Sequence, residues 1–286
     1  MASLSTYYWL AKPGIVYGNC LAATAGFLLA SKGHPSITLY IVMVGGIALV
    51  MASGCVFNNY IDRGIDEKMA RTKKRALVQG VLSATNALMY GTVLGIIGLA
   101  ILLTGTNALT FGLALAGLVL YVGVYGYWKR RSVHGTLVGS LAGAIPPVVG
   151  YCAVTNRFDL GALLLFLILV LWQMPHFYAI ALYRFKDYKA ADLPVLPVKQ
   201  GMNAAKQQAI AYIIAFILVI PVLSVTGYTG YSFAIIMMVI GLVWLLKAIR
   251  EYRTKDDAGW GRKLFGFSLI VMISLSVMLS VGSMLP

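Results

Sequence analysis

Long apolar runs determine what this chain can fold into. A helix needs about 20 consecutive, mostly apolar residues to cross a bilayer, and it satisfies its own backbone hydrogen bonds there. We find nine such runs in the 286-residue chain. They cover approximately residues 14–31, 37–57, 85–104, 107–128, 133–153, 160–180, 208–226, 231–247 and 265–284. The sequence therefore predicts an all-α polytopic membrane protein with nine transmembrane helices.

The basic residues predict how these helices are oriented. Lys and Arg collect in the short loops that remain on the cytoplasmic side of a membrane. If the N-terminus is cytoplasmic, 21 of the 23 Lys and Arg residues lie on that side, and only Lys32 and Arg157 lie outside. We therefore predict a cytoplasmic N-terminus and, after nine crossings, a periplasmic C-terminus. The net charge of +14 reflects this distribution and an attraction to anionic lipid headgroups, and it does not indicate nucleic acid binding.

Two polar segments interrupt the apolar pattern, at about residues 58–84 and 183–207. Each begins where an apolar run ends in a tyrosine and an aspartate: "NNYID" contains Asp62, and "YRFKD" contains Asp187. Because four predicted spans separate the two segments, both are expected on the same side of the membrane. This spacing predicts two four-helix repeats followed by a final helix, within one integral-membrane domain over residues 1–286.

The first polar segment has the spacing of a metal site. On a helix that continues from the second span, Asn58, Asp62 and Asp66 lie at i, i+4 and i+8 and share one face. An amide and two carboxylates form an all-oxygen surface suited to Mg²⁺, which commonly bridges to phosphates. Four basic residues follow between positions 71 and 75. Acids for a metal beside bases for an anion predict a diphosphate site, whereas the alternative is a solvated loop whose bases only set the topology.

The other charged ends of the spans supply further candidates. In the second polar segment we expect Asp187 to belong to the site, and we leave the role of Asp192 open because a separation of five does not place both on one helix face. Tyr125 and Lys129 lie at i and i+4 at the end of the fourth span. For Lys129 and its basic neighbours, the alternative is charge that merely ends a membrane span.

Two features inside the spans point towards a ligand. His176 follows Pro175 within "WQMPHF", and an ionisable residue inside a span is a functional candidate. The alternative is a histidine that hydrogen-bonds to a carbonyl freed by the proline. Several prolines and glycines predict a bent and thin fifth span, which serves either close helix packing or space for a large ligand: Pro146, Pro147, Gly139, Gly143 and Gly150.

Together these motifs resemble the UbiA superfamily of intramembrane prenyltransferases. The likeness is carried by "NNYIDRGIDEKMARTKKR" at 58–75, "YxxxKR" at 125–130 and the second acidic segment. Four further stretches resemble the branch of this superfamily that uses protohaem IX as acceptor: "KPGI" at 12–15, "GTLVGSLAGAIPPVVGY" at 135–151, "WQMPHFYAIALYRFKDY" at 172–188 and "PVLPV" at 194–198. The resemblance covers nearly the whole chain. One departure is Asn59, where the superfamily often has an aspartate.

The resemblance implies a fold and a set of site residues. The fold is a nine-helix bundle whose cavity opens to the inner leaflet, with two acidic motifs facing each other. The implied catalytic acids are Asp62, Asp66 and Asp187, which with Asn58 would hold Mg²⁺. The implied diphosphate ligands are Arg71, Arg75, Lys129 and Arg130. We expect His176 to contact the iron or a propionate of haem.

The resemblance also implies a reaction and a location. The reaction transfers a farnesyl group from farnesyl diphosphate to a vinyl group of protohaem IX, giving haem O and diphosphate, in a bacterial cytoplasmic membrane. The product would serve downstream assembly of haem–copper oxidases. The alternative within the superfamily is an aromatic acceptor such as 4-hydroxybenzoate. A remote alternative is a secondary transporter, which the lack of charged residues at the predicted span centres disfavours.

Overall fold

The computed structural model describes residues 3–286. Within this range all regular structure is helical, and nine helical segments are long and apolar enough to cross a membrane. Both findings confirm the predicted fold class. Three spans differ most from the predicted bounds: the second continues to Asp66, the seventh begins at Met202, and the ninth begins at Asp257.

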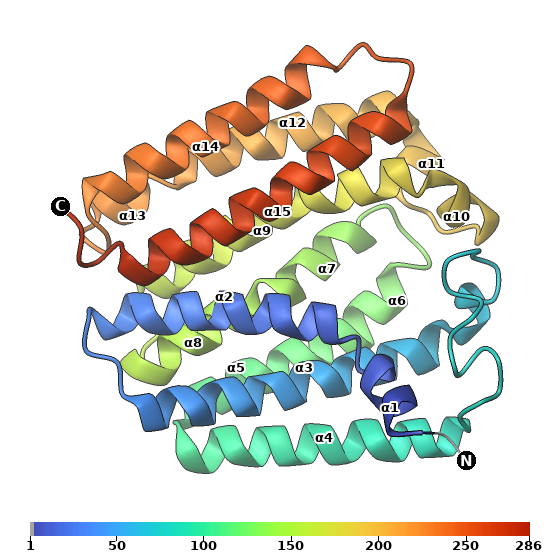
Figure 1. Ribbon diagram of the computed structural model, residues 1–286, viewed down its shortest axis with the longest axis horizontal. Coiled ribbons are helices and arrows are strands. Elements are labelled where there is room, and N and C mark those ends of the chain that lie inside the picture. The colour runs from blue at the N-terminus through green and yellow to red at the C-terminus, as the bar shows by residue number, and fades with distance from the viewer. Residues whose placement is uncertain (1–2) are drawn as a thin grey trace.

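The elements follow one another as single or broken helices (Figure 1). A short helix, α1 (Leu4–Leu10), precedes the first span. Five of the first eight spans are single helices: α2 (Pro13–Ser31), α3 (Ile37–Asp66), α4 (Ala84–Gly105), α9 (Leu160–Tyr183) and α14 (Tyr231–Arg250). The final span, α15 (Asp257–Val281), is also a single helix. The broken spans are α5 (Ala108–Val119) with the π-helical turn η1 (Leu120–Tyr125) and α6 (Gly126–Trp128), α7 (Gly135–Gly143) with α8 (Ile145–Thr155), and α12 (Met202–Val219) with α13 (Val222–Val225). Between the sixth and seventh spans lie α10 (Phe185–Ala190) and α11 (Leu196–Gln200).

Local sequence signals explain where many of these helices begin. The side chains of Ser36, Ser83 and Asn107 accept hydrogen bonds from backbone N–H groups in the first turns of α3, α4 and α5. Such caps satisfy donors that have no partner within the helix. Pro146 lies in the first turn of α8 and Pro221 separates α12 from α13, because proline lacks the N–H that a continuing helix needs.

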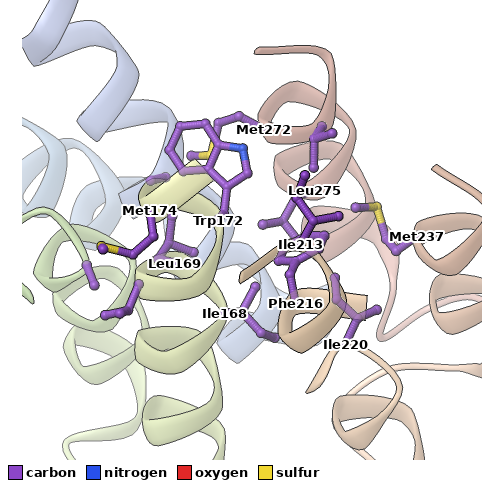
Figure 2. Close-up of a cluster of buried hydrophobic side chains, with 14 of the residues drawn as sticks. Ile168, Leu169, Trp172, Met174, Ile213, Phe216, Ile220, Met237, Met272 and Leu275 are labelled. Carbon is purple, nitrogen blue, oxygen red and sulfur yellow. The ribbon is translucent and has the colours of Figure 1, made fainter. Parts of the chain in front are cut away.

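Helix α9 lies at the centre of the bundle and packs against α15, α12, α7 and α8 (Figure 1). Figure 2 shows Ile168 and Trp172 of α9 near Phe216 of α12 and Leu275 of α15, in a cluster of buried side chains. The indole N–H of Trp172 also donates a 2.9 Å hydrogen bond to the backbone oxygen of Ser268. This packing fixes the helix that leads into the second polar segment.

Helices α2 and α8 pack so closely that the glycines between them leave no room for a side chain. A Cβ atom on Gly150 would overlap the carbonyl oxygen of Ala23, and one on Gly26 would overlap that of Pro147. Small residues permit this distance, as they do at many helix interfaces in membranes. Close packing is therefore the role of Gly150, and the alternative prediction of space for a large ligand at this position is wrong.

The two polar segments meet at one end of the bundle, where Figure 1 shows α10 beside the end of α3. Met69 of the first segment lies in a buried cluster with Ala191 and Leu193 of the second, and Ile65 and Tyr188 pack against it. This contact confirms that both segments lie on the same side. The relation of two four-helix repeats, and the extent of the domain, remain predictions.

Candidate active site

The acidic face of α3 forms as the sequence predicts. Asn58, Asp62 and Asp66 lie on the last turns of one continuous 30-residue helix, and each is about 95% buried. At 1.5 Å per residue such a helix is about 45 Å long, which exceeds the roughly 30 Å hydrocarbon core of a bilayer. The acidic face therefore lies beyond the apolar part of the helix, at the membrane edge.

Two cations from the end of the fourth span flank Asp62. The ammonium group of Lys129 pairs with one carboxylate oxygen of Asp62, and the guanidinium of Arg130 lies 3.3 Å from the other. Arg130 also donates to the backbone oxygen of Ile61. Burial lowers the pKa of Lys129, although Asp62 opposes this shift. These two ion pairs join the end of the fourth span to the acidic face of the second.

The loop after α3 folds back over Asp66. A guanidinium nitrogen of Arg75 lies 2.5 Å from a carboxylate oxygen of Asp66. The hydroxyl of Thr72 donates a 2.9 Å hydrogen bond to the backbone oxygen of Asp66. Arg71, which the sequence groups with Arg75, is exposed and forms no ion pair within residues 3–286. The structure thus separates two arginines that the sequence treats as equivalent.

The aromatic side chains beside Lys129 come from the π-helical turn. Tyr121 and Tyr125 stack with ring centroids 5.7 Å apart, and the ammonium of Lys129 lies 5.1 Å from the centroid of Tyr125. The sequence places Tyr125 and Lys129 four positions apart, and in the structure their side chains are in contact. Single π-helical turns are frequent at functional sites, since they change the direction in which side chains point.

Lys12 also belongs to this site, although the charge pattern of the sequence indicates only that it helps to orient the helices. Its ammonium group donates a 2.7 Å hydrogen bond to the side-chain oxygen of Asn58. Burial, together with the nearby charges of Arg75 and Lys129, lowers the pKa of Lys12 to about 8. Its backbone is left-handed, with φ of 52°, directly before Pro13 begins α2. The "KPG" at the start of the first span was the only signal for this residue, because its partner lies on another helix.

Asn59, the departure from the superfamily pattern, ties α1 to α3. Its amide nitrogen donates a 2.7 Å hydrogen bond to the backbone oxygen of Leu10, at the end of α1. An aspartate cannot donate this bond when it is ionised. The amide oxygen of Asn59 is buried and has no hydrogen-bond partner within residues 3–286. Asn59 therefore supports the corner that carries Lys12.

Asp187 lies at the same end of the bundle but outside the paired acids. It is half-buried in α10 and forms no ion pair in the described part of the chain. Its neighbour Tyr188 packs against the first polar segment, and burial raises the pKa of Tyr188 to about 12. Among residues 3–286, no three His, Cys, Asp or Glu side chains are grouped closely enough to hold one metal ion. The structure thus brings Asp62 and Asp66 to one face and leaves Asp187 apart from them.

His176 is held by aromatic rings and by Ser268. Its Nδ1 lies 2.7 Å from the hydroxyl of Ser268 on α15. The imidazole stacks on Trp172 with centroids 4.9 Å apart and lies 5.0 Å from the ring of Phe265. Its hydrogen-bond partner is a side chain and not the carbonyl freed by Pro175. Contact with haem remains a prediction for this residue.

Asn58, Asp62 and Asp66 have the donor chemistry that Mg²⁺ prefers. All three present oxygen atoms on one buried helix face, and two of them carry charge. Each carboxylate is paired with Lys or Arg, and Lys12 donates a hydrogen bond to the amide oxygen of Asn58. A ligand that supplies both a metal and an anion can therefore exchange partners with every member of the site.

Comparisons with known proteins identify the family to which the chain is similar. The model of the UbiA prenyltransferase family matches residues 19–270. The chain is 53% identical to a protoheme IX farnesyltransferase of Serratia proteamaculans, over 97% of this chain and 94% of that one. It is 54% identical to the protein of the same name from Citrobacter koseri, over 98% and 95%.

Solved structures show the same fold at low identity. A digeranylgeranylglyceryl phosphate synthase superposes with a TM-score of 0.78 at 18% identity, covering 98% of each chain. A UbiA homologue from Archaeoglobus fulgidus bound to GPP and Mg²⁺ superposes with a TM-score of 0.73 at 16% identity, covering 96% of this chain and 100% of the other. With its helical bundle, acidic face and family match in agreement, this chain belongs to the UbiA prenyltransferase family.

Proposed function

We propose that this prenyltransferase transfers a farnesyl group from farnesyl diphosphate to a vinyl group of protohaem IX, releasing diphosphate and giving haem O. The observation that carries the proposal is the buried face of α3, where Asp62 and Asp66 are each held by basic side chains from other segments. The acceptor and the length of the prenyl group follow the names of the relatives, which match over nearly their full length.

The paired charges support a mechanism based on exchange of partners. Before substrate binds, Lys129 and Arg130 neutralise Asp62, and Arg75 neutralises Asp66. Asp62 and Asp66 would hold the metal ion of a bound diphosphate, and Lys129, Arg130 and Arg75 would then contact the phosphate oxygens. The cations that would stabilise the departing diphosphate are thus gathered around the acidic face before substrate binds.

Asn58, Asp62 and Asp66 would hold Mg²⁺, with Asp187 joining from the second polar segment. When bound, the ion supplies positive charge that neutralises the leaving diphosphate. The chain's own contribution is to keep Lys12, Arg75 and Lys129 within reach of the same phosphate oxygens. A UbiA homologue of the same fold has been solved with GPP and Mg²⁺, which supports this assignment.

The apolar bundle protects the reactive prenyl group. Loss of diphosphate leaves an allylic cation at C1 of the farnesyl group, and water must be excluded until the acceptor reacts. The vinyl group forms the new carbon–carbon bond to C1, and the resulting cation on the porphyrin side takes up water and loses a proton. A hydroxyethylfarnesyl substituent results. His176, between Trp172 and Phe265, is the proposed haem contact.

We further propose the orientation that the charge distribution predicts, with the acidic face of α3 on the cytoplasmic side of a bacterial cytoplasmic membrane. The structure places Lys12, the loop after α3, Lys129 and α10 around one end of the bundle. That end would receive both substrates, and haem O would pass to haem–copper oxidase assembly.

The decisive experiment uses purified protein in lipid nanodiscs with farnesyl diphosphate, Mg²⁺ and protohaem IX, followed by mass spectrometry of the porphyrin. The expected product carries one hydroxyethylfarnesyl group. A parallel reaction offers 4-hydroxybenzoate in place of protohaem. Prenylation of the aromatic acid with an unchanged porphyrin would disprove the proposed acceptor.

A matched pair of variants tests the site. Asp62→Asn is expected to abolish Mg²⁺-dependent turnover, since it removes the carboxylate that lies between two cations. Glu67→Gln changes an exposed acid five residues further along the chain and is expected to retain activity. Wild-type rates in both variants would rule out the proposed role of Asp62.

A further inference from the structure

A hollow of about 240 Å³ lies between α14 and α15, away from the acidic face of α3. Figure 1 shows α14 along one edge of the bundle, with α15 beside it. The hollow is at the end of these helices that carries basic residues, where α14 finishes and α15 begins. Its lining includes Lys247, Glu251, Arg262, Lys263, Phe267 and Ile270.

The hollow has more positive charge than its own residues neutralise. Lys263 pairs with both carboxylate oxygens of Glu251, at 2.8 and 2.9 Å. Within residues 3–286, neither Lys247 nor Arg262 forms an ion pair. The ammonium of Lys247 instead lies 5.4 Å from the ring centroid of Phe267. Two cations therefore face one small space without a counter-ion from the chain.

Helix dipoles account for only one of these cations. Lys247 lies in the last turn of α14, where the dipole stabilises a positive charge. Arg262 is the sixth residue of α15, beyond the first turn in which the dipole of that helix acts. Within residues 3–286 neither a helix dipole nor an ion pair offsets the charge of Arg262, and an external anion would balance it.

The other wall of the hollow is apolar and faces outwards. Ile270 is 53% exposed, and it continues along α15 from Phe267. A Cβ atom on Gly266 would meet nothing within 4 Å, so the surface between these side chains is open. The hollow therefore joins a basic end to a lipid-facing apolar surface, which matches a phosphate group joined to an acyl chain.

We propose that the hollow between α14 and α15 binds an anionic phospholipid, with Lys247 and Arg262 contacting the phosphodiester and with the acyl chain lying over Gly266 and Ile270. Basic pockets between transmembrane helices bind anionic headgroups in this way. The ligand is a lipid of the surrounding leaflet, because a free phosphate ion would make no contact with the apolar wall. This site is independent of the prenyl-transfer chemistry.

Native mass spectrometry of the delipidated protein tests the proposal, with titration of phosphatidylglycerol and of phosphatidylcholine that carry the same acyl chains. The wild type is expected to bind phosphatidylglycerol more tightly. The double variant Lys247→Gln with Arg262→Gln should weaken that binding by roughly 30-fold. The control, Arg253→Gln with Lys255→Gln, removes two charges from the adjoining loop, outside the hollow, and should leave binding unchanged.

A second variant keeps every charge. Gly266→Leu fills the apolar part of the hollow with a residue that favours helix, so the protein should fold while phosphatidylglycerol binding falls. Excess inorganic phosphate should not displace the lipid. No preference for phosphatidylglycerol in the wild type, equal losses in both double variants, unchanged binding by Gly266→Leu, or displacement by inorganic phosphate would each overturn the proposal.

Discussion

The ammonium group of Lys12 donates a 2.7 Å hydrogen bond to the side-chain oxygen of Asn58, although 46 positions separate the two residues in the sequence. The bond joins the corner between α1 and α2 to the acidic face of α3. Because this oxygen is one of the proposed Mg²⁺ ligands, metal binding would release Lys12. The freed ammonium group would then contact the diphosphate beside Lys129 and Arg75.

Lys12→Met is therefore expected to lower kcat/KM for farnesyl diphosphate by roughly 10- to 100-fold, as for loss of a hydrogen bond to a charged group. Lys12→Arg keeps the charge and should recover part of the loss. Initial rates at varied farnesyl diphosphate measure the effect. Lys68→Met removes an exposed cation nearby and serves as control. If both methionine variants behaved alike, Lys12 would have no specific role.

Asn59→Asp is expected to weaken the enzyme even though it restores an acid that is common in the superfamily. The carboxylate would face the backbone oxygen of Leu10, lose the 2.7 Å hydrogen bond, and destabilise the contact between α1 and α3 by about 1 to 3 kcal/mol. Hydrogen exchange over α1 should rise, and thermal stability should fall. An Asn59→Asp enzyme with unchanged exchange and faster turnover would contradict this interpretation.

Arg75 and Arg71 are expected to respond differently to the same substitution. Arg75→Gln breaks the pair with the buried carboxylate of Asp66, so it should lower the free energy of unfolding by about 1 to 2 kcal/mol in the absence of substrate. Arg71→Gln removes an exposed side chain and should leave stability unchanged. Both should raise KM for farnesyl diphosphate. Thermal unfolding with and without substrate separates the two effects, and equal destabilisation would contradict the observed pairing.

His176→Gln tests the proposed haem contact. Glutamine can keep a hydrogen bond to Ser268 but removes the imidazole, so the Soret band of the protohaem complex should shift and KM for protohaem should rise. Ser268→Ala disturbs the 2.7 Å hydrogen bond while leaving the imidazole in place, and it should shift the band less. Identical spectra for the wild type and His176→Gln would exclude an iron contact.

The orientation can be tested by labelling single cysteines in a variant without Cys20, Cys55 and Cys152. A cysteine at Lys74 should react with an impermeant reagent only from the cytoplasmic side, because this position lies in the predicted inner loop. A cysteine at Lys32 should react only from the outside. The reverse pattern would invert the predicted topology.

Much of the fold was predictable from the sequence, because a membrane imposes length and composition on each span. The nine spans follow from this constraint, and the shared face of Asn58, Asp62 and Asp66 follows from helical spacing. The contact between Tyr125 and Lys129 is equally local. These features depend on residues that are neighbours on one helix.

The rest of the site depends on contacts between helices, which spacing does not encode. Lys12 reaches Asn58 from a different helix, and His176 reaches Ser268 across 92 positions. The sequence also gave no reason to separate Arg71 from Arg75. At Gly150 the absence of a side chain is compatible with open space or with close packing, and only the position of α2 decides between them.

Because α3 is uninterrupted, its length fixes the distance between its first residue and the acidic face. From its cap at Ser36 to Asp62 the chain rises about 39 Å, at 1.5 Å per residue. The depth of the acidic face is therefore set by a residue count and not by the strength of any contact. A prenyl diphosphate in the membrane would keep its charged head among the lipid headgroups and its prenyl tail in the hydrocarbon. The carboxylates would then lie at the depth where the head joins the tail.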